Sequence, residues 1–128
     1  MIEIKKEFKN QVILITGADS YLARELLKKF VKVDVKLILL DKKFKKKNKN
    51  SNYNYYEVDF LDNEQFDKII KDIKKKFFKI DKIINIAGFT GDMIAKSINK
   101  ITWKEIYQVN LYSVKKICTK LKSNLSKS

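Results

Sequence analysis

Four short apolar runs, separated by stretches with helical periodicity, constrain this chain most strongly. The runs read "QVILITG", "VKLILLD", "NYYEVDF" and "DKIINIAG". They are almost continuously apolar, which is typical of parallel strands covered by helices on both faces. Because parallel neighbours need crossover connections, and these are right-handed, the order predicts an α/β fold with a doubly wound parallel sheet.

Three helices are predicted between and after these runs. Residues 21–32 place apolar side chains at i, i+4 spacing on one side, and this core-facing set is Leu22, Ala23, Leu26, Leu27, Phe30 and Val31. Asp62 with Gln65 forms a capping box for the second helix. Its apolar stripe is Phe66, Ile69, Ile70, Ile73 and Phe77.

The third helix is predicted to open at a capping box of Thr102 and Glu105 and to run to about Leu121, after which "KSNLSKS" trails off. Its expected buried stripe is Trp103, Ile106, Val114, Ile117 and Leu121. By contrast, "KKFKKKNKNSN", between the second and third runs, has no periodicity and predicts a solvated loop or a frayed short helix.

Composition sets further limits. The 128 residues fit one domain, 1–128, and no linker divides them. No apolar run is long enough to span a bilayer and the first ten residues are charged, so we expect a soluble cytoplasmic protein with no membrane partner. The single cysteine, Cys118, excludes an internal disulfide. The absence of histidine argues against metal sites and His-dependent catalysis.

The formal charge of +14 raises the question of a nucleic-acid partner. Arg24 is the only arginine, however, so the other basic residues are all lysine. Because arginine is preferred for bidentate reading of phosphates and bases, we expect the charge to lie mostly on solvated faces, and we do not expect a nucleic-acid partner.

The three glycines indicate where a ligand would bind. In a doubly wound sheet of strand order 3-2-1-4, a crevice opens beyond the carboxyl ends of strands one and four, where the winding reverses. Gly17 follows the first apolar run, and Gly88 and Gly91 follow the fourth. All three are therefore expected at this crevice.

Several short motifs resemble one family in order and context. Thr16-Gly17 with Leu22-Ala23, Asp41, Asp59, "NIAG" at 85–88 and "WKEIYQVNLYSV" around Asn110 resemble the amino-terminal half of the short-chain dehydrogenase/reductase family. The match is collinear over nearly the whole chain. It implies a Rossmann-like NAD(P)-binding domain that is incomplete, with the fifth strand onward absent.

The resemblance implies a nucleotide-phosphate loop with fewer glycines than usual. The cofactor-binding residues implied here are Thr16, Gly17, Ser20, Tyr21 and Leu22. Depending on the alignment, Ser20 or Tyr21 stands where the family has its middle glycine. A side chain there holds the backbone away from a pyrophosphate, although the helix amino terminus still offers amide donors. Asp19 is a candidate to cap that helix and compete for those donors.

Further cofactor contacts are implied along the strand ends. Asp41 lies roughly 20 residues beyond the loop, where an acidic side chain accepts hydrogen bonds from the adenosine ribose and favours NAD over NADP. Lysines at 42, 43, 45, 46 and 47 argue the other way, so NADP stays possible. Asp59 resembles the aspartate beside the adenine, and the alternative for it is an ordinary turn residue at the end of a strand. In "NIAG", Asn85 would brace the sheet, and Ala87 and Gly88 would allow the backbone to approach the cofactor.

Asn110 matches the family's catalytic asparagine, which kinks its helix and holds a water that feeds the catalytic lysine. The alternative for a buried amide at this position is a satisfied helix–helix contact. The family's Ser and Tyr-x-x-x-Lys would follow a fifth strand. The pair Tyr112 and Lys116 has that spacing but lies on the same helix as Asn110, so we interpret it as coincidental.

Three functions remain in order of preference. The first is the cofactor-binding half of an NAD(P)-dependent alcohol or ketone oxidoreductase, inactive alone, with an exposed fourth strand that predicts a homo-oligomer or a split partner. The second is a non-catalytic Rossmann-like module that senses dinucleotide or mediates an interaction. The third is a lysine-rich binder of RNA or another polyanion.

Overall fold

A parallel sheet of four strands lies at the centre of the computed structural model, which describes residues 4–88 and 103–126. The strands are β1 (Val12–Thr16), β2 (Lys36–Asp41), β3 (Tyr53–Glu57) and β4 (Lys82–Asn85). They lie in the order β3-β2-β1-β4, and all three pairings are parallel. The predicted fold class and strand order are therefore confirmed.

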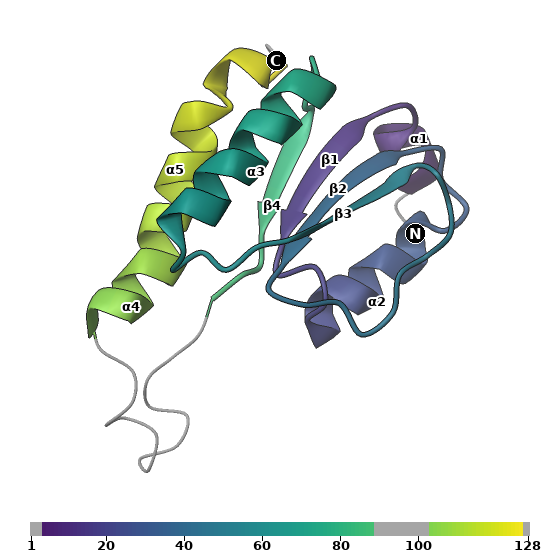
Figure 1. Ribbon diagram of the computed structural model, residues 1–128. Helices are drawn as coiled ribbons and strands as arrows, with labels where there is room; N and C mark the ends of the chain where they lie inside the picture. The colour runs from purple at the N-terminus through teal and green to yellow at the C-terminus, as the bar shows by residue number, and fades with distance from the viewer. Residues whose placement is uncertain (1–3, 89–102, 127–128) are drawn as a thin grey trace.

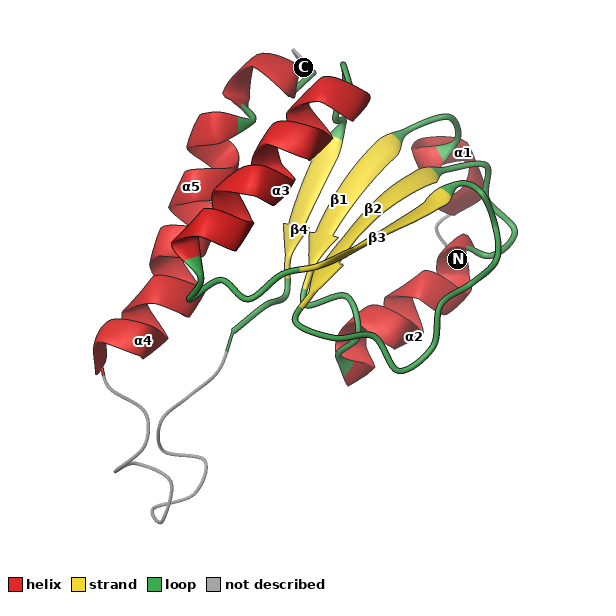
Figure 2. Cartoon of the chain, in the orientation of Figure 1, coloured by secondary structure: helices red, strands yellow, loops and turns green. Residues whose placement is uncertain are grey.

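Helices cover both faces of the sheet (Figure 1; Figure 2). On one face, α2 (Tyr21–Phe30) packs over β1 and β2, where Ile13 and Ile15 join the same apolar cluster as Phe30. On the other face, Leu14 points into the cluster built by α3 (Asn63–Lys76) and the last helix. Alternate residues of β1 thus enter opposite cores, as the pleat of a strand requires.

The predicted core face of α2 is partly wrong. Ala23 and Phe30 are buried, but Leu22 and Val31 are 64% and 58% exposed. The buried face is centred on Ala23 and Phe30, a spacing of i, i+7, and this leaves the two flanking positions turned toward solvent. The sequence also did not predict α1 (Ile4–Phe8), a short helix whose Phe8 ring packs edge-on against Phe30 at 5.4 Å.

The last helix is interrupted in its middle. It consists of α4 (Trp103–Tyr107), a π-helical segment η2 (Gln108–Tyr112) and α5 (Ser113–Lys120). The buried positions are Val109, Ser113, Ile117 and Leu121. Because a π turn shifts the helical phase, the stripe predicted from Trp103 is wrong at its start. Trp103 is 84% exposed and Asn110 is exposed rather than buried.

The predicted capping box at the start of α3 is only partly confirmed. Asp62 caps α3 by accepting a hydrogen bond from the Gln65 amide at 3.0 Å. The Gln65 side chain accepts from the Asp59 amide at 2.7 Å, so it reaches one turn further back than a capping box would. The predicted capping residue Thr102 and the third glycine, Gly91, lie outside the described residues. The loop predicted between β2 and β3 is confirmed.

The described carboxyl-terminal residues do not trail off. After the 3₁₀ turn η3 (Lys122–Asn124), Leu125 forms a parallel bridge with Ile80. The Ile80 amide donates to the Asn124 carbonyl at 2.7 Å, and the Ser126 amide donates to the Ile80 carbonyl at 2.9 Å. These residues therefore begin to pair along the outer side of β4. Among the described helices, none has the length and apolarity needed to cross a membrane.

Candidate functional site

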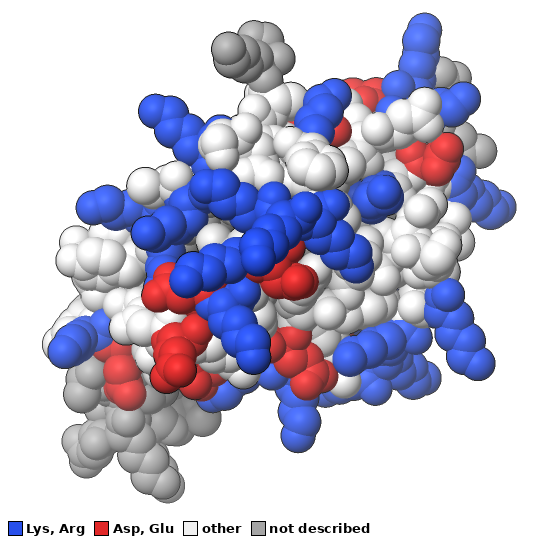
Figure 3. Space-filling model, turned by 45° about the horizontal axis from the view of Figure 1, so that its top comes forward, with Lys and Arg blue, Asp and Glu red and all other residues white. Residues whose placement is uncertain are grey.

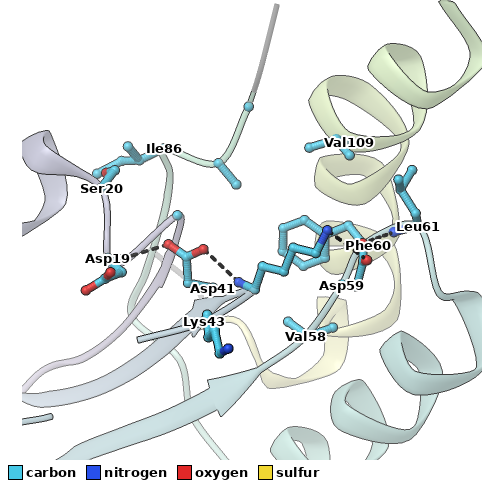
Figure 4. Close-up of a pocket in the computed structure, with 14 residues that line it drawn as sticks. Asp19, Ser20, Asp41, Lys43, Val58, Asp59, Phe60, Leu61, Ile86 and Val109 are labelled. Carbon is cyan, nitrogen blue, oxygen red and sulfur yellow. Dashed lines mark hydrogen bonds and ion pairs between the residues drawn. The ribbon is translucent and has the colours of Figure 1, made fainter. Parts of the chain in front are cut away.

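A cleft of about 410 Å³ opens at the carboxyl edge of the sheet, which we define as the side where the strands end. Residues that follow each of the four strands line it. In Figure 4, Asp19, Ser20 and Asp41 lie on one side of the cleft, and Asp59, Phe60 and Leu61 lie on the other. Of the predicted site residues, the cleft brings together Gly17, Ser20, Asp41, Asp59, Ala87 and Gly88.

Gly17, which follows β1, packs closely against the backbone of Ala87, which follows β4. Its φ is +66°, in the left-handed region that favours glycine. A Cβ added at this position would lie 2.6 Å from the Ala87 amide nitrogen and 2.8 Å from the Ala87 Cα. Both obstacles are backbone atoms, so the backbone itself would have to move. Glycine is therefore required here for the loop after β1 to pack against the backbone that follows β4.

Two polar side chains lie beside the segment that follows β4, where it meets the end of β1. Thr16 is buried, and its Oγ1 accepts a hydrogen bond from the Ala87 amide at 3.2 Å. Asn110, in η2, faces Gly88 instead of the core: a Cβ on Gly88 would lie 3.1 Å from Asn110 Oδ1. Thr16 thus holds the wall of the cleft from inside, and Asn110 lies at its rim.

Asp41 fixes the loop that follows β1. Its Oδ2 accepts a hydrogen bond from the Asp19 amide at 2.8 Å, and its Oδ1 accepts from the Lys42 amide at 2.7 Å. Charge-assisted bonds of this kind are the stronger class of hydrogen bond. Asp19 itself does not cap α2, contrary to the alternative raised above. Its carboxylate faces Arg24 Nη1 at 3.9 Å and accepts from the Lys45 amide at 3.4 Å.

Asp59 lies opposite Asp41. Its Oδ1 accepts from the Leu61 amide at 3.0 Å, and its Oδ2 pairs with Lys42 Nζ at 3.3 Å. Lys42 therefore reaches from the end of β2 to the end of β3. The lysine side chain is 74% exposed, so this pair contributes little to stability. The Asp59 amide is already bonded to Gln65, which leaves the carboxylate as its contact for a ligand.

The start of α2 provides a small side chain and free amide positions. Ser20 is the N-cap, and its Oγ accepts from the Ala23 amide at 3.2 Å. The side chains of Tyr21 and Leu22 are 74% and 64% exposed and do not line the cleft. What they can offer a ligand is the backbone amides of the first helical turn, which have no partner within a helix. Asn85 ends β4 and is exposed.

Sequence reasoning missed the apolar wall of the cleft. Val58, Phe60, Leu61, Ile86 and Val109 line it, and the Phe60 ring packs against Phe66 with centroids 4.7 Å apart. The signal available was position, since Val58 and Ile86 follow a strand directly and Phe60 and Leu61 lie a few residues beyond the end of β3. An apolar residue at such a place cannot be told from core by sequence, and Val109 is brought in only by tertiary packing.

Tyr112 and Lys116 do not form a dyad in this cleft. Lys116 Nζ lies 2.9 Å from Asp67 Oδ1 and 4.7 Å from the centre of the Phe66 ring. This ammonium group lowers the pKa of the Asp67 carboxyl. The Tyr112 ring instead packs edge-on against Tyr107 at 5.5 Å. In the part of the chain that is described, no group of three or more acidic, histidine or cysteine side chains could hold a metal ion.

Comparisons with known proteins agree with this geometry. A family model described as short chain dehydrogenase matches residues 11–128. A short chain dehydrogenase from Leptospira borgpetersenii with bound NAD+ is 21% identical, with a TM-score of 0.68, and the match covers 94% of this chain and 48% of that one. A family protein from Francisella tularensis is 18% identical, with a TM-score of 0.74 over 91% of this chain and 47% of that one.

A third similar structure is ElxO with NADP bound. It is 23% identical, with a TM-score of 0.65, and the match covers 88% of this chain and 50% of that one. The chain thus spans about half the length of the solved structures it matches. Together with the parallel sheet, the glycine contact and the cleft at the strand ends, the family match over nearly every residue shows that this chain belongs to the short chain dehydrogenase family.

Proposed function

We propose that the cleft binds NAD(P) and that the chain is the cofactor-binding half of an NAD(P)-dependent oxidoreductase acting on an alcohol or ketone. The observation that carries this proposal is Gly17, held in the left-handed region against the Ala87 backbone at the mouth of the cleft. No side chain fits there. The first glycine of a dinucleotide-binding loop makes such a tight turn, and here the turn brings the ends of β1 and β4 together at the cleft.

The residues around the cleft fit different parts of such a ligand. The Asp41 and Asp59 carboxylates suit the hydroxyl and amino groups of the adenosine half, because both accept hydrogen bonds. The amides at the start of α2 suit the pyrophosphate, since a helix amino terminus favours anions. Gly88 and Asn110 flank the remaining end. When bound, the nicotinamide would supply the hydride chemistry, and Asn110 keeps its predicted supporting role.

We expect NAD to be preferred over NADP. The Asp41 carboxylate, fixed by two backbone amides, would repel a 2′-phosphate. Lys42 and Lys43 also line the cleft and would attract that phosphate. Lys42 is already paired with Asp59, however, so less of its charge is available. The bound ligands of the Leptospira protein and of ElxO show that both nucleotides occur among similar structures.

The proposal includes association, either with a second copy of this chain or with a separate chain that covers the open side of β4. The outer side of β4 is bridged at Ile80, and its own residues are at most half-buried. Trp103, Tyr107 and Leu111 are exposed at i, i+4 spacing on the neighbouring helix. An open strand and an apolar stripe favour association. Sedimentation velocity would test this, and a monomer at all concentrations would oppose it.

A cytoplasmic location also remains part of the proposal, with Cys118 as a free thiol.

Titration of the 128-residue chain with NADH and NADPH tests the central proposal. The anisotropy of the nucleotide's own fluorescence is the suitable signal, because the exposed Trp103 does not line the cleft. We expect saturable binding, tighter for NADH, and no turnover of ketones by these residues alone. A folded chain that binds neither nucleotide would refute the proposal. Assembly without binding would favour the interaction module, and salt-sensitive RNA retention would favour the polyanion binder.

A further inference from the structure

An exposed phenylalanine lies among lysines at the amino edge of the sheet, the side where the strands begin. Residues 74–79 read "KKKFFK", contain no acidic residue, and connect the end of α3 to β4. Phe77 is buried, but Phe78 is 90% exposed, the highest value among the exposed large apolar residues described. We call Lys74, Lys75, Lys76, Phe78, Lys79 and Lys122 the Phe78 tip.

The Phe78 tip is held in place by the carboxyl-terminal residues. Asn124 Nδ2 donates to the Lys74 carbonyl at 3.0 Å and to the Phe77 carbonyl at 2.7 Å. The Ile80 amide donates to the Asn124 carbonyl at 2.7 Å. Both ends of the short turn are thus bonded to Asn124 of η3, the 3₁₀ turn that also contains Lys122. The turn is therefore a fixed projection that presents Phe78 to solvent.

The lysines of the tip differ in their partners. Lys76 Nζ donates to Asn54 Oδ1 at 3.0 Å, and Lys79 Nζ pairs with Asp81 at 3.0 Å. Lys74, Lys75 and Lys122 have no ion pair with any described residue. Figure 3 shows basic side chains crowded together across the middle of the view, with acidic side chains beside them. Lysines in the last turn stabilise a helix, but that effect does not account for an aromatic side chain beside them.

We propose that the Phe78 tip docks on an anionic lipid surface. Unpaired lysines are attracted to anionic headgroups, and a single projecting aromatic ring can enter the interface between headgroups and acyl chains. A lipid surface suits this tip better than a nucleic acid, because the tip is a projection and its cations are all lysines, which act as point charges. The absence of a spanning segment, on which the expectation of no membrane partner rested, does not bear on a peripheral contact.

Docking at the amino edge leaves the candidate cofactor cleft at the opposite, carboxyl edge facing away from the lipid. The two activities are therefore expected to be independent. Saturating NADH should leave vesicle binding unchanged, and vesicles should leave NADH affinity unchanged. For this reason a failure of cofactor binding would not disturb the lipid test, and a failure of lipid binding would not disturb the cofactor proposal.

Co-sedimentation of the 128-residue chain with vesicles tests this inference. We expect binding to mixed phosphatidylserine and phosphatidylcholine, loss of binding with added salt, and little binding to phosphatidylcholine alone. Phe78→Ser should lower the partition coefficient about tenfold, as expected for partial burial of one ring. Lys74→Gln and Lys75→Gln should each lower it about fivefold.

Matched controls separate the tip from general charge. The double variant Lys45→Gln/Lys46→Gln removes two charges from the loop after β2, at the other edge, and Tyr112→Ser removes a half-exposed ring from η2 that lies outside the proposed association stripe. Neither should change vesicle binding by more than about twofold. The tip side chains are exposed, so unchanged thermal unfolding is expected for every variant. Equal loss in controls and tip variants, equal binding to neutral vesicles, or RNA retention without vesicle binding would overturn the proposal.

Discussion

The two edges of the sheet carry opposite chemistry. At the carboxyl edge, Asp19, Asp41 and Asp59 line a cleft whose backbone approaches closely at Gly17. At the amino edge, the turn between α3 and β4 gathers lysines around an exposed Phe78. The same helices and strands connect the two edges, so the difference arises from the short segments at their ends.

The contrast shows how a parallel sheet separates functions. Every strand of such a sheet ends on the same side, so loops that follow strands converge there and loops that precede strands converge on the other side. Carboxylates at the carboxyl edge are bonded to backbone amides and thereby shape a cavity. Most cations at the amino edge point into solvent. The carboxyl edge therefore forms a cleft of the size of a small ligand, whereas the amino edge presents an exposed Phe78 among lysines.

The largest effect is expected when the carboxyl edge is blocked. Gly17→Val would place side-chain atoms against the Ala87 backbone and force a left-handed φ on a β-branched residue. We expect a loss of about 3 kcal/mol in the free energy of unfolding and no measurable NADH binding. Urea unfolding and nucleotide anisotropy measure the two. Gly88→Ala is the matched control: its nearest obstacle is the Asn110 side chain, which can move, so a smaller loss is expected. Wild-type NADH affinity in Gly17→Val would contradict the cofactor assignment.

An intermediate effect is expected at Asp41, which holds the loop that follows β1. In the wild-type protein both Asp41 carboxylate oxygens accept hydrogen bonds from backbone amides. Asp41→Asn replaces one of these oxygens by an NH₂ group, which cannot accept and would face a backbone N–H donor. The expected cost is about 1–2 kcal/mol in stability, with a roughly tenfold loss of NADH affinity. NADPH affinity should fall less, because the repelling charge is removed. Titrations with both nucleotides give the ratio of affinities, and an unchanged ratio would argue against Asp41 as the selective residue.

At the amino edge, acid pH should weaken a single carboxylate contact. Burial raises the pKa of the Asp81 carboxyl, but bonds from the Val12 amide, Lys79 and Ser126 outweigh burial and leave this pKa below its usual value. A lowered folded-state pKa adds stability above the unfolded value near 4, and this stability is lost as the pH falls through the folded pKa.

Asp81→Asn should therefore cost about 1 kcal/mol at neutral pH and progressively less below about pH 4. Urea unfolding at several pH values measures this difference. Asp67→Asn is the control: the pKa of the Asp67 carboxyl is lowered by its ion pair with Lys116, but the carboxylate itself is half-exposed, so a smaller, salt-sensitive loss is expected. A cost for Asp81→Asn that does not change with pH would show that packing, and not ionisation, is responsible.

The smallest effect is expected at Ser20, in the loop between β1 and α2. Ser20 caps α2 and lines the cleft, where the family's middle glycine is one candidate match. Ser20→Gly should raise NADH affinity about threefold by opening space beside the backbone, at a cost of only a few tenths of a kcal/mol. Tyr21→Gly tests the other alignment and should not raise affinity, since the Tyr21 side chain does not line the cleft. The reverse result would favour the alignment in which Tyr21 stands at the family's middle glycine.

Sequence reasoning was most successful where local pattern and tertiary structure require the same thing. The apolar runs predicted the four strands, and Gly17 with "NIAG" predicted the meeting of β1 and β4. It was wrong where helical phase is set by a non-local event. The π turn moved Asn110 from the predicted buried stripe to the rim of the cleft, and it left Trp103 in solvent.

The sequence by itself predicted the four strands and the helices that cover both faces of the sheet, because apolar periodicity is a local property. The strand order followed from the doubly wound fold class that this pattern indicates. Only the tertiary structure decided which groups Asp41 and Asp59 hold, which apolar residues wall the cleft, and that Phe78 is exposed while Phe77 is buried. Those outcomes depend on atoms far apart in the chain, whose distances are set only when the helices pack against the sheet.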